Sequence, residues 1–137
     1  MTLLTVGVAL WWFAHLFRRI APGPRAALGE GPGKGAVALF LVIAIVLMVV
    51  GYQNAGPLFL YVSPGWTWHL NNLLMLASIA LLGMGSSKGR ARTWLRHPML
   101  TGVLVWAVAH LLVNGDVPSL ALFGGLGLWA IVEMVVI

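Results

Sequence analysis

The residues of this 137-residue chain that are best suited to carry chemistry are its four histidines, His15, His69, His97 and His110. Imidazole is the commonest metal ligand in proteins and exchanges protons near neutral pH. The chain contains no cysteine, which excludes disulfides, thiolate metal sites and cysteine catalysis. Any site in this protein is therefore expected to depend on imidazole.

The composition indicates the environment of these histidines. Hydrophobic residues make up 61% of the chain and charged residues 8%, whereas an ordinary soluble domain has roughly 25% charged residues. A soluble fold of this length could not hide so much apolar surface from water. We therefore predict an integral membrane protein, surrounded by membrane lipid. The composition excludes a disordered protein, a secreted disulfide scaffold and a nucleic-acid-binding module.

Five apolar segments are long enough to be considered as membrane-spanning helices, which need about 20 mostly apolar residues. They cover residues 2–19, 36–51, 68–85, 95–113 and 119–137 approximately. The segments are too long for strands and lack an alternating pattern. The predicted fold class is all-α: a polytopic transmembrane helix bundle of about five helices, forming a single transmembrane domain over residues 1–137. The Pro- and Gly-rich stretch between the first two segments is predicted to be a surface connector.

The basic residues predict the orientation in the membrane. All eight lie in two connections or in the segment ends that border them, after the first and after the third apolar segments: Arg18, Arg19, Arg25, Lys34, Lys88, Arg90, Arg92 and Arg96. The connections after the second and fourth segments contain none. Since Lys and Arg accumulate on the cytoplasmic side, we predict an outside N-terminus and an inside C-terminus.

This topology sorts the histidines by depth. His15 lies just before the first basic cluster and His97 directly follows the second, so both are expected near the inner side at similar depth. His110 lies 13 residues after His97, about 19.5 Å farther out along a helix. It is therefore expected near His69, at the outer side.

The shared depth of His15 and His97 suggests a cofactor between them. His97 precedes Pro98 and is predicted to be the N-cap of the fourth helix. A helix N-terminus favours the neutral imidazole, which is the form that binds iron or zinc. Two imidazoles from separate helices can hold a haem from its two faces. Each histidine could instead be a hydrogen-bonded structural residue.

A stripe on the fourth helix is a second candidate for cofactor binding. Gly102, Trp106 and His110 follow one another at i, i+4 spacing and share one face. Gly102 would admit a flat ligand and Trp106 would stack against it. Gly102 could equally mark a close contact between helices.

Two acidic residues complete the candidates. Glu133 is expected in the inner half of the last helix, where it would pair with Arg18, Arg19 or Arg96, or accept a hydrogen bond from a ligand histidine. Asp116 is expected to cap a helix in the short outer turn.

Several stretches together resemble one family of membrane proteins. The stretches are 96–100 (RHPML), 104–116 (LVWAVAHLLVNGD), 15–22, 66–76 and 123–130. The first two resemble the signature of NnrU-family proteins, which are named for nitrite and nitric-oxide reduction gene clusters and are similar to zeta-carotene isomerase.

The resemblance implies haem b held by histidines, with His15 and His97 as the matching ligands. It implies either isomerisation of a conjugated, hydrophobic isoprenoid or a role in nitrogen-oxide metabolism, in the bacterial inner (cytoplasmic) membrane. Relatives usually continue past the fifth helix, through a charged loop, into another hydrophobic segment.

Two other hypotheses remain open. Arg96, His97 and Pro98, with Gly102, also resemble the motif of isoprenylcysteine carboxyl methyltransferases and phospholipid methyltransferases, which implies S-adenosylmethionine bound near Arg96 and His97. That family usually has an aromatic residue after the His-Pro pair, where this chain has Met99. Alternatively, the chain is a non-catalytic accessory subunit of a larger membrane complex.

Overall fold

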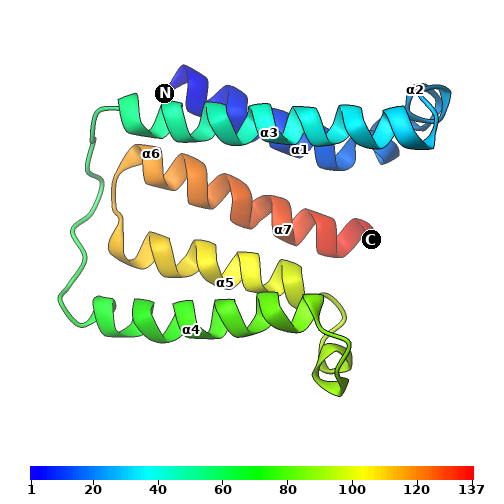
Figure 1. The fold of residues 1–137 in the computed structure, drawn as a ribbon. Coiled ribbons are helices and arrows are strands. Elements are labelled where there is room, and N and C mark those ends of the chain that lie inside the picture. The colour runs from blue at the N-terminus through cyan, green and yellow to red at the C-terminus, as the bar shows by residue number, and fades with distance from the viewer. The chain divides into compact units, whose positions relative to one another are not determined.

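The chain is helical and contains no strand, which confirms the predicted all-α class (Figure 1). The computed structural model describes residues 1–137. The α-helices are α1 (Thr2–Ile20), α2 (Pro22–Ala27), α3 (Glu30–Asn54), α4 (Thr67–Ser86), α5 (Pro98–Val113), α6 (Val117–Ser119) and α7 (Gly125–Val136). A 3₁₀ turn, η1 (Arg90–Trp94), precedes α5, and a π-helical turn, η2 (Leu120–Gly124), joins α6 to α7.

The helices form two compact units, Met1–Gly56 and Pro57–Ile137. The first contains α1, α2 and α3, and the second contains the remaining helices. The single transmembrane domain over residues 1–137 stays a prediction.

In the first unit, α1 and α3 pack closely in antiparallel fashion because glycines remove side chains from their contact. A Cβ on Gly51 would lie 2.3 Å from the backbone nitrogen of Leu4, and a Cβ on Gly7 would lie 2.8 Å from that of Met48. Small residues permit this approach of two helices surrounded by apolar solvent.

The connection between α1 and α3 is more ordered than the sequence indicates. Pro22 begins the short helix α2, and Gly29, with φ of 78°, ends it in a conformation that favours glycine. α3 then begins at Glu30, six residues before the predicted start at residue 36. The earlier start is possible because Pro32 lies in the first turn, where proline removes no helical hydrogen bond.

In the second unit, α5 lies between α4 and α7 (Figure 1). A Cβ on Gly102 of α5 would lie 3.1 Å from the backbone nitrogen of Leu82 on α4. Beside this contact, the buried Ser78 hydroxyl donates to the Gly102 carbonyl over 2.8 Å. Gly102 therefore lies at a close helix–helix contact, which is one of its two predicted roles.

An extended segment, residues 58–63, covers the C-terminal end of α5. The Tyr61 hydroxyl donates to the carbonyl of Leu111 and, over 3.0 Å, to that of Asn114. The Ser63 hydroxyl donates to the Leu112 carbonyl. Since the last carbonyls of a helix have no partner within it, this segment supplies the hydrogen bonds that α5 needs there.

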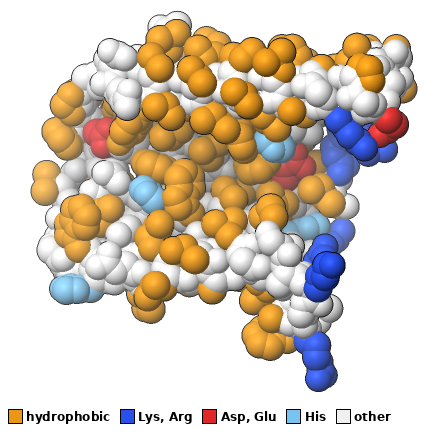
Figure 2. Space-filling view, in the orientation of Figure 1, with side chains coloured by type: hydrophobic (Ala, Val, Ile, Leu, Met, Phe, Trp, Pro, Cys, Tyr) orange, Lys and Arg blue, Asp and Glu red, His pale blue; other side chains and the backbone are white.

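Four helical segments are long and apolar enough to cross a membrane: α1, α3, α4 and Val117–Val136. Large hydrophobic side chains are exposed along the helices (Figure 2), which is expected where lipid is the solvent. α5 is apolar but has 16 residues, or about 24 Å, against a hydrocarbon core of about 30 Å. The number of crossings and the orientation of the termini stay predictions.

The α1–α3 contact gives a first test. Gly51→Ala places a methyl group against the α1 backbone, and we expect this overpacking to destabilise the protein by about 1–3 kcal/mol. Thermal unfolding in detergent, followed by circular dichroism, measures the effect. Gly35→Ala on the same helix is the control, since nothing lies within 4 Å of its Cβ position. Equal unfolding temperatures for the two variants would contradict the close contact.

Candidate functional site

His15 is held on α1 by its own helix. Its Nδ1 lies 3.0 Å from the carbonyl oxygen of Trp11, and its ring centroid lies 4.4 Å from that of Trp11. A ring nitrogen that faces a carbonyl must carry the proton, because the carbonyl only accepts. In the neutral ring, Nε2 then carries the lone pair, which is the arrangement of a metal-binding histidine.

His15 lines a cavity of about 360 Å³ within the first unit. Its charged lining is cationic, and one wall is apolar. The lining residues are Ala14, His15, Arg18, Arg25, Lys34, Val37, Ala38 and Leu41. Such a cavity suits a ligand that has an apolar body and an anionic group.

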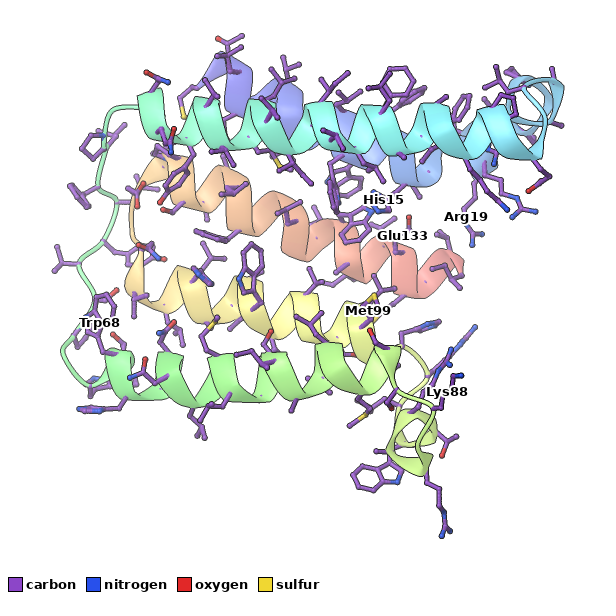
Figure 3. All side chains as sticks on the ribbon, viewed as in Figure 1. His15, Arg19, Trp68, Lys88, Met99 and Glu133 are labelled. Carbon is purple, nitrogen blue, oxygen red and sulfur yellow. The ribbon has the colours of Figure 1, made fainter.

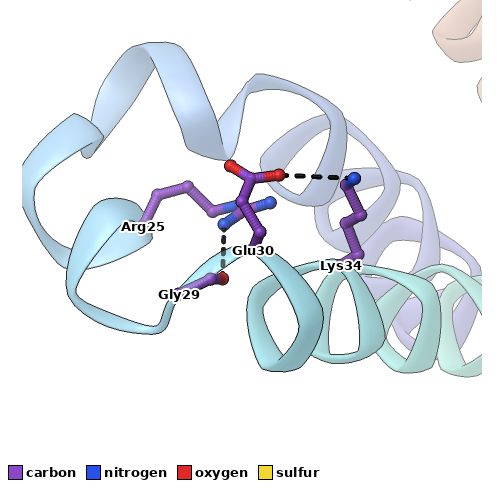
Figure 4. A network of polar contacts seen from close by, with 4 residues as sticks. All are labelled: Arg25, Gly29, Glu30 and Lys34. Atoms are coloured by element: carbon purple, nitrogen blue, oxygen red, sulfur yellow. Dashed lines mark hydrogen bonds and ion pairs between the residues drawn. The ribbon is translucent and has the colours of Figure 1, made fainter.

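The polar side of this cavity is built by the α2–α3 connection (Figure 4). The Arg25 guanidinium donates from Nη1 to the Gly29 carbonyl over 3.2 Å. Nearby, the Lys34 ammonium lies 3.3 Å from the Glu30 carboxylate, four residues earlier on α3. Arg25 lies beside the Glu30 carboxylate but forms no ion pair with it, since the ion-pair partner of Glu30 is Lys34.

In the second unit, His97 is the N-cap residue of α5 and Pro98 is the first helical residue, as predicted. The His97 carbonyl accepts hydrogen bonds from the amide (2.9 Å) and the hydroxyl (2.8 Å) of Thr101. Its imidazole Nε2 is buried and has no hydrogen-bond partner. A buried polar atom without a partner is costly in a finished protein, and this nitrogen is therefore a candidate ligand atom.

His97 also lines a cavity, of about 210 Å³, at the start of α5. Arg92 and Arg96 are its charged lining residues, and Met99 contributes to its apolar lining. Figure 3 labels Met99 in the first turn of α5 and Lys88 in the connection between α4 and α5. Each predicted iron ligand thus lies in a cavity together with arginine side chains.

His110 belongs to an aromatic cluster inside the second unit. Its Nδ1 lies 2.8 Å from the Trp106 carbonyl oxygen, which repeats the arrangement of His15 and Trp11. Its ring stacks on Phe123, with centroids 4.4 Å apart and an interplanar angle of 24°. Trp106 meets the same Phe123 edge to face at 5.1 Å. Phe123 of the π turn η2 thus contacts the rings of both Trp106 and His110.

The remaining candidate residues, Asp116, His69 and Glu133, line neither of the two cavities. Asp116 caps α6, as predicted: its carboxylate accepts from the Ser119 hydroxyl at 2.7 Å. His69 is exposed in the first turn of α4 and makes no contact with His110. Glu133 is 5% exposed on α7 (Figure 3), and its pairing with an arginine stays a prediction.

His15 and His97 lie in different compact units, so their meeting stays a prediction. The same holds for cofactor binding by Arg96, Gly102, Trp106 and His110. Arg25, Lys34 and Arg92 also line the cavities, although nothing in the sequence had indicated them.

A sequence pattern does accompany two of the histidines. Trp-x-x-x-His occurs twice, at residues 11–15 and 106–110, and in both cases the imidazole Nδ1 faces the tryptophan carbonyl.

Together, these features define a helical membrane protein with two imidazole-containing cavities. The family model of the NnrU protein matches residues 3–137, nearly the whole chain. The chain therefore belongs to the NnrU protein family, as the resemblance predicted. No curated protein and no solved structure matches it.

The two Trp–His pairs give a second test. We expect the neutral rings of His15 and His110 to carry their proton on Nδ1, because that nitrogen faces a carbonyl in each case. Nitrogen-15 chemical shifts of the labelled, cofactor-free protein report the tautomer. His69, which makes no such hydrogen bond, is the internal reference. An Nε2-protonated ring at either position would contradict the assignment.

Proposed function

We propose that this NnrU-family protein is a membrane protein that binds haem b, with His15 and His97 as the iron ligands. The observation that carries the proposal is the state of these two imidazoles. The Nδ1 of His15 is occupied by a backbone carbonyl, and the Nε2 of His97 is buried without a partner. The Nε2 atoms of His15 and His97 are the nitrogens that we propose as iron ligands.

The residues around each imidazole fit this cofactor. Haem b combines a flat apolar ring with two carboxylate side chains. The first cavity offers Val37, Ala38 and Leu41 as an apolar wall, with cations beside it. The second offers Pro98, Met99 and Leu100 beside two arginines. The donor set also fits, since neutral imidazole is a common haem ligand.

When bound, the haem would supply Lewis-acid or one-electron chemistry toward a lipid-soluble partner such as a conjugated isoprenoid, or toward a nitrogen oxide. The protein's own residues would determine the setting of that chemistry. The Trp11 carbonyl fixes the orientation and the tautomer of His15. His97 is held as the N-cap residue of α5, with its Nε2 buried and without a hydrogen-bond partner.

The distribution of charge supports a place in the cytoplasmic membrane. In each unit the lysines and arginines gather at one end of the helices, around α2 in the first unit and around η1 in the second (Figure 2). If these ends face the cytoplasm, five crossings place the N-terminus outside and the C-terminus inside. The ligand histidines would then lie toward the cytoplasmic face.

Optical spectroscopy of the purified protein tests the proposal. We expect a Soret band and the visible bands of low-spin iron with two imidazole ligands. His15→Ala and His97→Ala should each remove the low-spin signature and weaken haem binding by about 100-fold or more, because loss of even an indirect partner of a metal costs about 10–100-fold.

His69→Ala is the matched control, because His69 is exposed and lines neither cavity. Its spectrum should equal that of the unchanged protein. A low-spin spectrum that survives in both ligand variants would overturn the ligand assignment. A protein that neither carries haem nor takes it up would overturn the function.

A further inference from the structure

The cavity around His15 has a polar side that iron ligation alone does not explain. Three cations, Arg18, Arg25 and Lys34, line it, and the one carboxylate beside them is that of Glu30, which pairs with Lys34. The cavity therefore has an excess of two positive charges. Lys34 is exposed and paired with Glu30, whereas Arg25 is half-buried and held against α3.

Arg25 is placed in this cavity by two specific contacts. Its Nη1 donates to the Gly29 carbonyl, and its guanidinium lies directly against the backbone of Gly33 on α3. A Cβ on Gly33 would lie 2.1 Å from Nη1 and 2.7 Å from Cζ. The guanidinium thus occupies the space that any side chain at residue 33 would fill. The absence of that side chain is what lets Arg25 reach this position.

We propose that Arg25, with Arg18 and Lys34, forms the binding site for the carboxylates of the cofactor. The inference rests on the proposed function, because it names how the same ligand is held. A guanidinium binds a carboxylate through two parallel hydrogen bonds, and such charged bonds are roughly twice as strong as neutral ones. The apolar wall of Val37, Ala38 and Leu41 lies beside these cations, so one amphipathic ligand can contact both.

The test compares two forms of one cofactor by Soret titration of the haem-free protein in detergent. One is haem b, and the other is its dimethyl ester, which keeps the iron and the ring but has no carboxylate charge. We expect the unchanged protein to bind haem b about tenfold or more tightly than the ester. Equal affinities would overturn the carboxylate site.

Two variants separate the position of Arg25 from its charge. Arg25→Gln removes the charge, whereas Gly33→Ala keeps it and displaces the guanidinium. Both should lose most of the preference for haem b and leave the affinity for the ester unchanged. Gly35→Ala is the matched control, since it adds the same methyl group to α3 with nothing within 4 Å. A Gly33→Ala protein that behaves like Gly35→Ala would also overturn the inference.

The failures of the two proposals can be told apart. If His15→Ala keeps both the low-spin spectrum and the preference for haem b, the ligand assignment falls and the carboxylate site stands. If haem and its ester bind equally well through intact histidines, the carboxylate site alone falls. If neither compound binds, both proposals fall. Circular dichroism of each variant shows that a loss of binding is not a loss of fold.

Discussion

Close contact between antiparallel helix backbones is the constraint on which both units depend. In a membrane, lipid is as apolar as leucine, so burial of apolar surface does little to bring helices together. Van der Waals contact and interhelical hydrogen bonds must do so instead. Gly51 meets the backbone of Leu4 in the first unit. In the second, Gly102 meets Leu82 and its carbonyl accepts from Ser78.

These contacts also determine where the histidines lie. Leu4, Gly7 and Ala14 are the buried residues of α1 and recur at helical spacing on one face. His15 directly follows Ala14, so it flanks this face and lines the cavity beside it. On α5, Gly102 packs against α4, while His110 lies two turns later and faces Phe123. The helix contact and the imidazole thus occupy neighbouring positions rather than the same one.

Sequence reasoning succeeded where a local rule determines the structure. Pro98 predicts the N-cap at His97, and the position of Asp116 predicts its cap. The cavity residues were not predicted from the sequence, because Arg25 lies in a Pro- and Gly-rich stretch that is typical of a loop. Only the chain reversal at Gly29 and the open space at Gly33 bring this side chain to α3. The π turn η2 was equally invisible, since it changes the register inside one continuous apolar segment.

The charge around each imidazole limits what can bind there. A bare metal dication would be repelled by the guanidinium groups beside His15 and His97. An uncharged apolar molecule would contact the apolar wall but would give the guanidinium groups no anionic partner. A ligand with an apolar body and anionic groups would contact the apolar wall and the cations together. The lining therefore favours an amphipathic anion over a free metal ion.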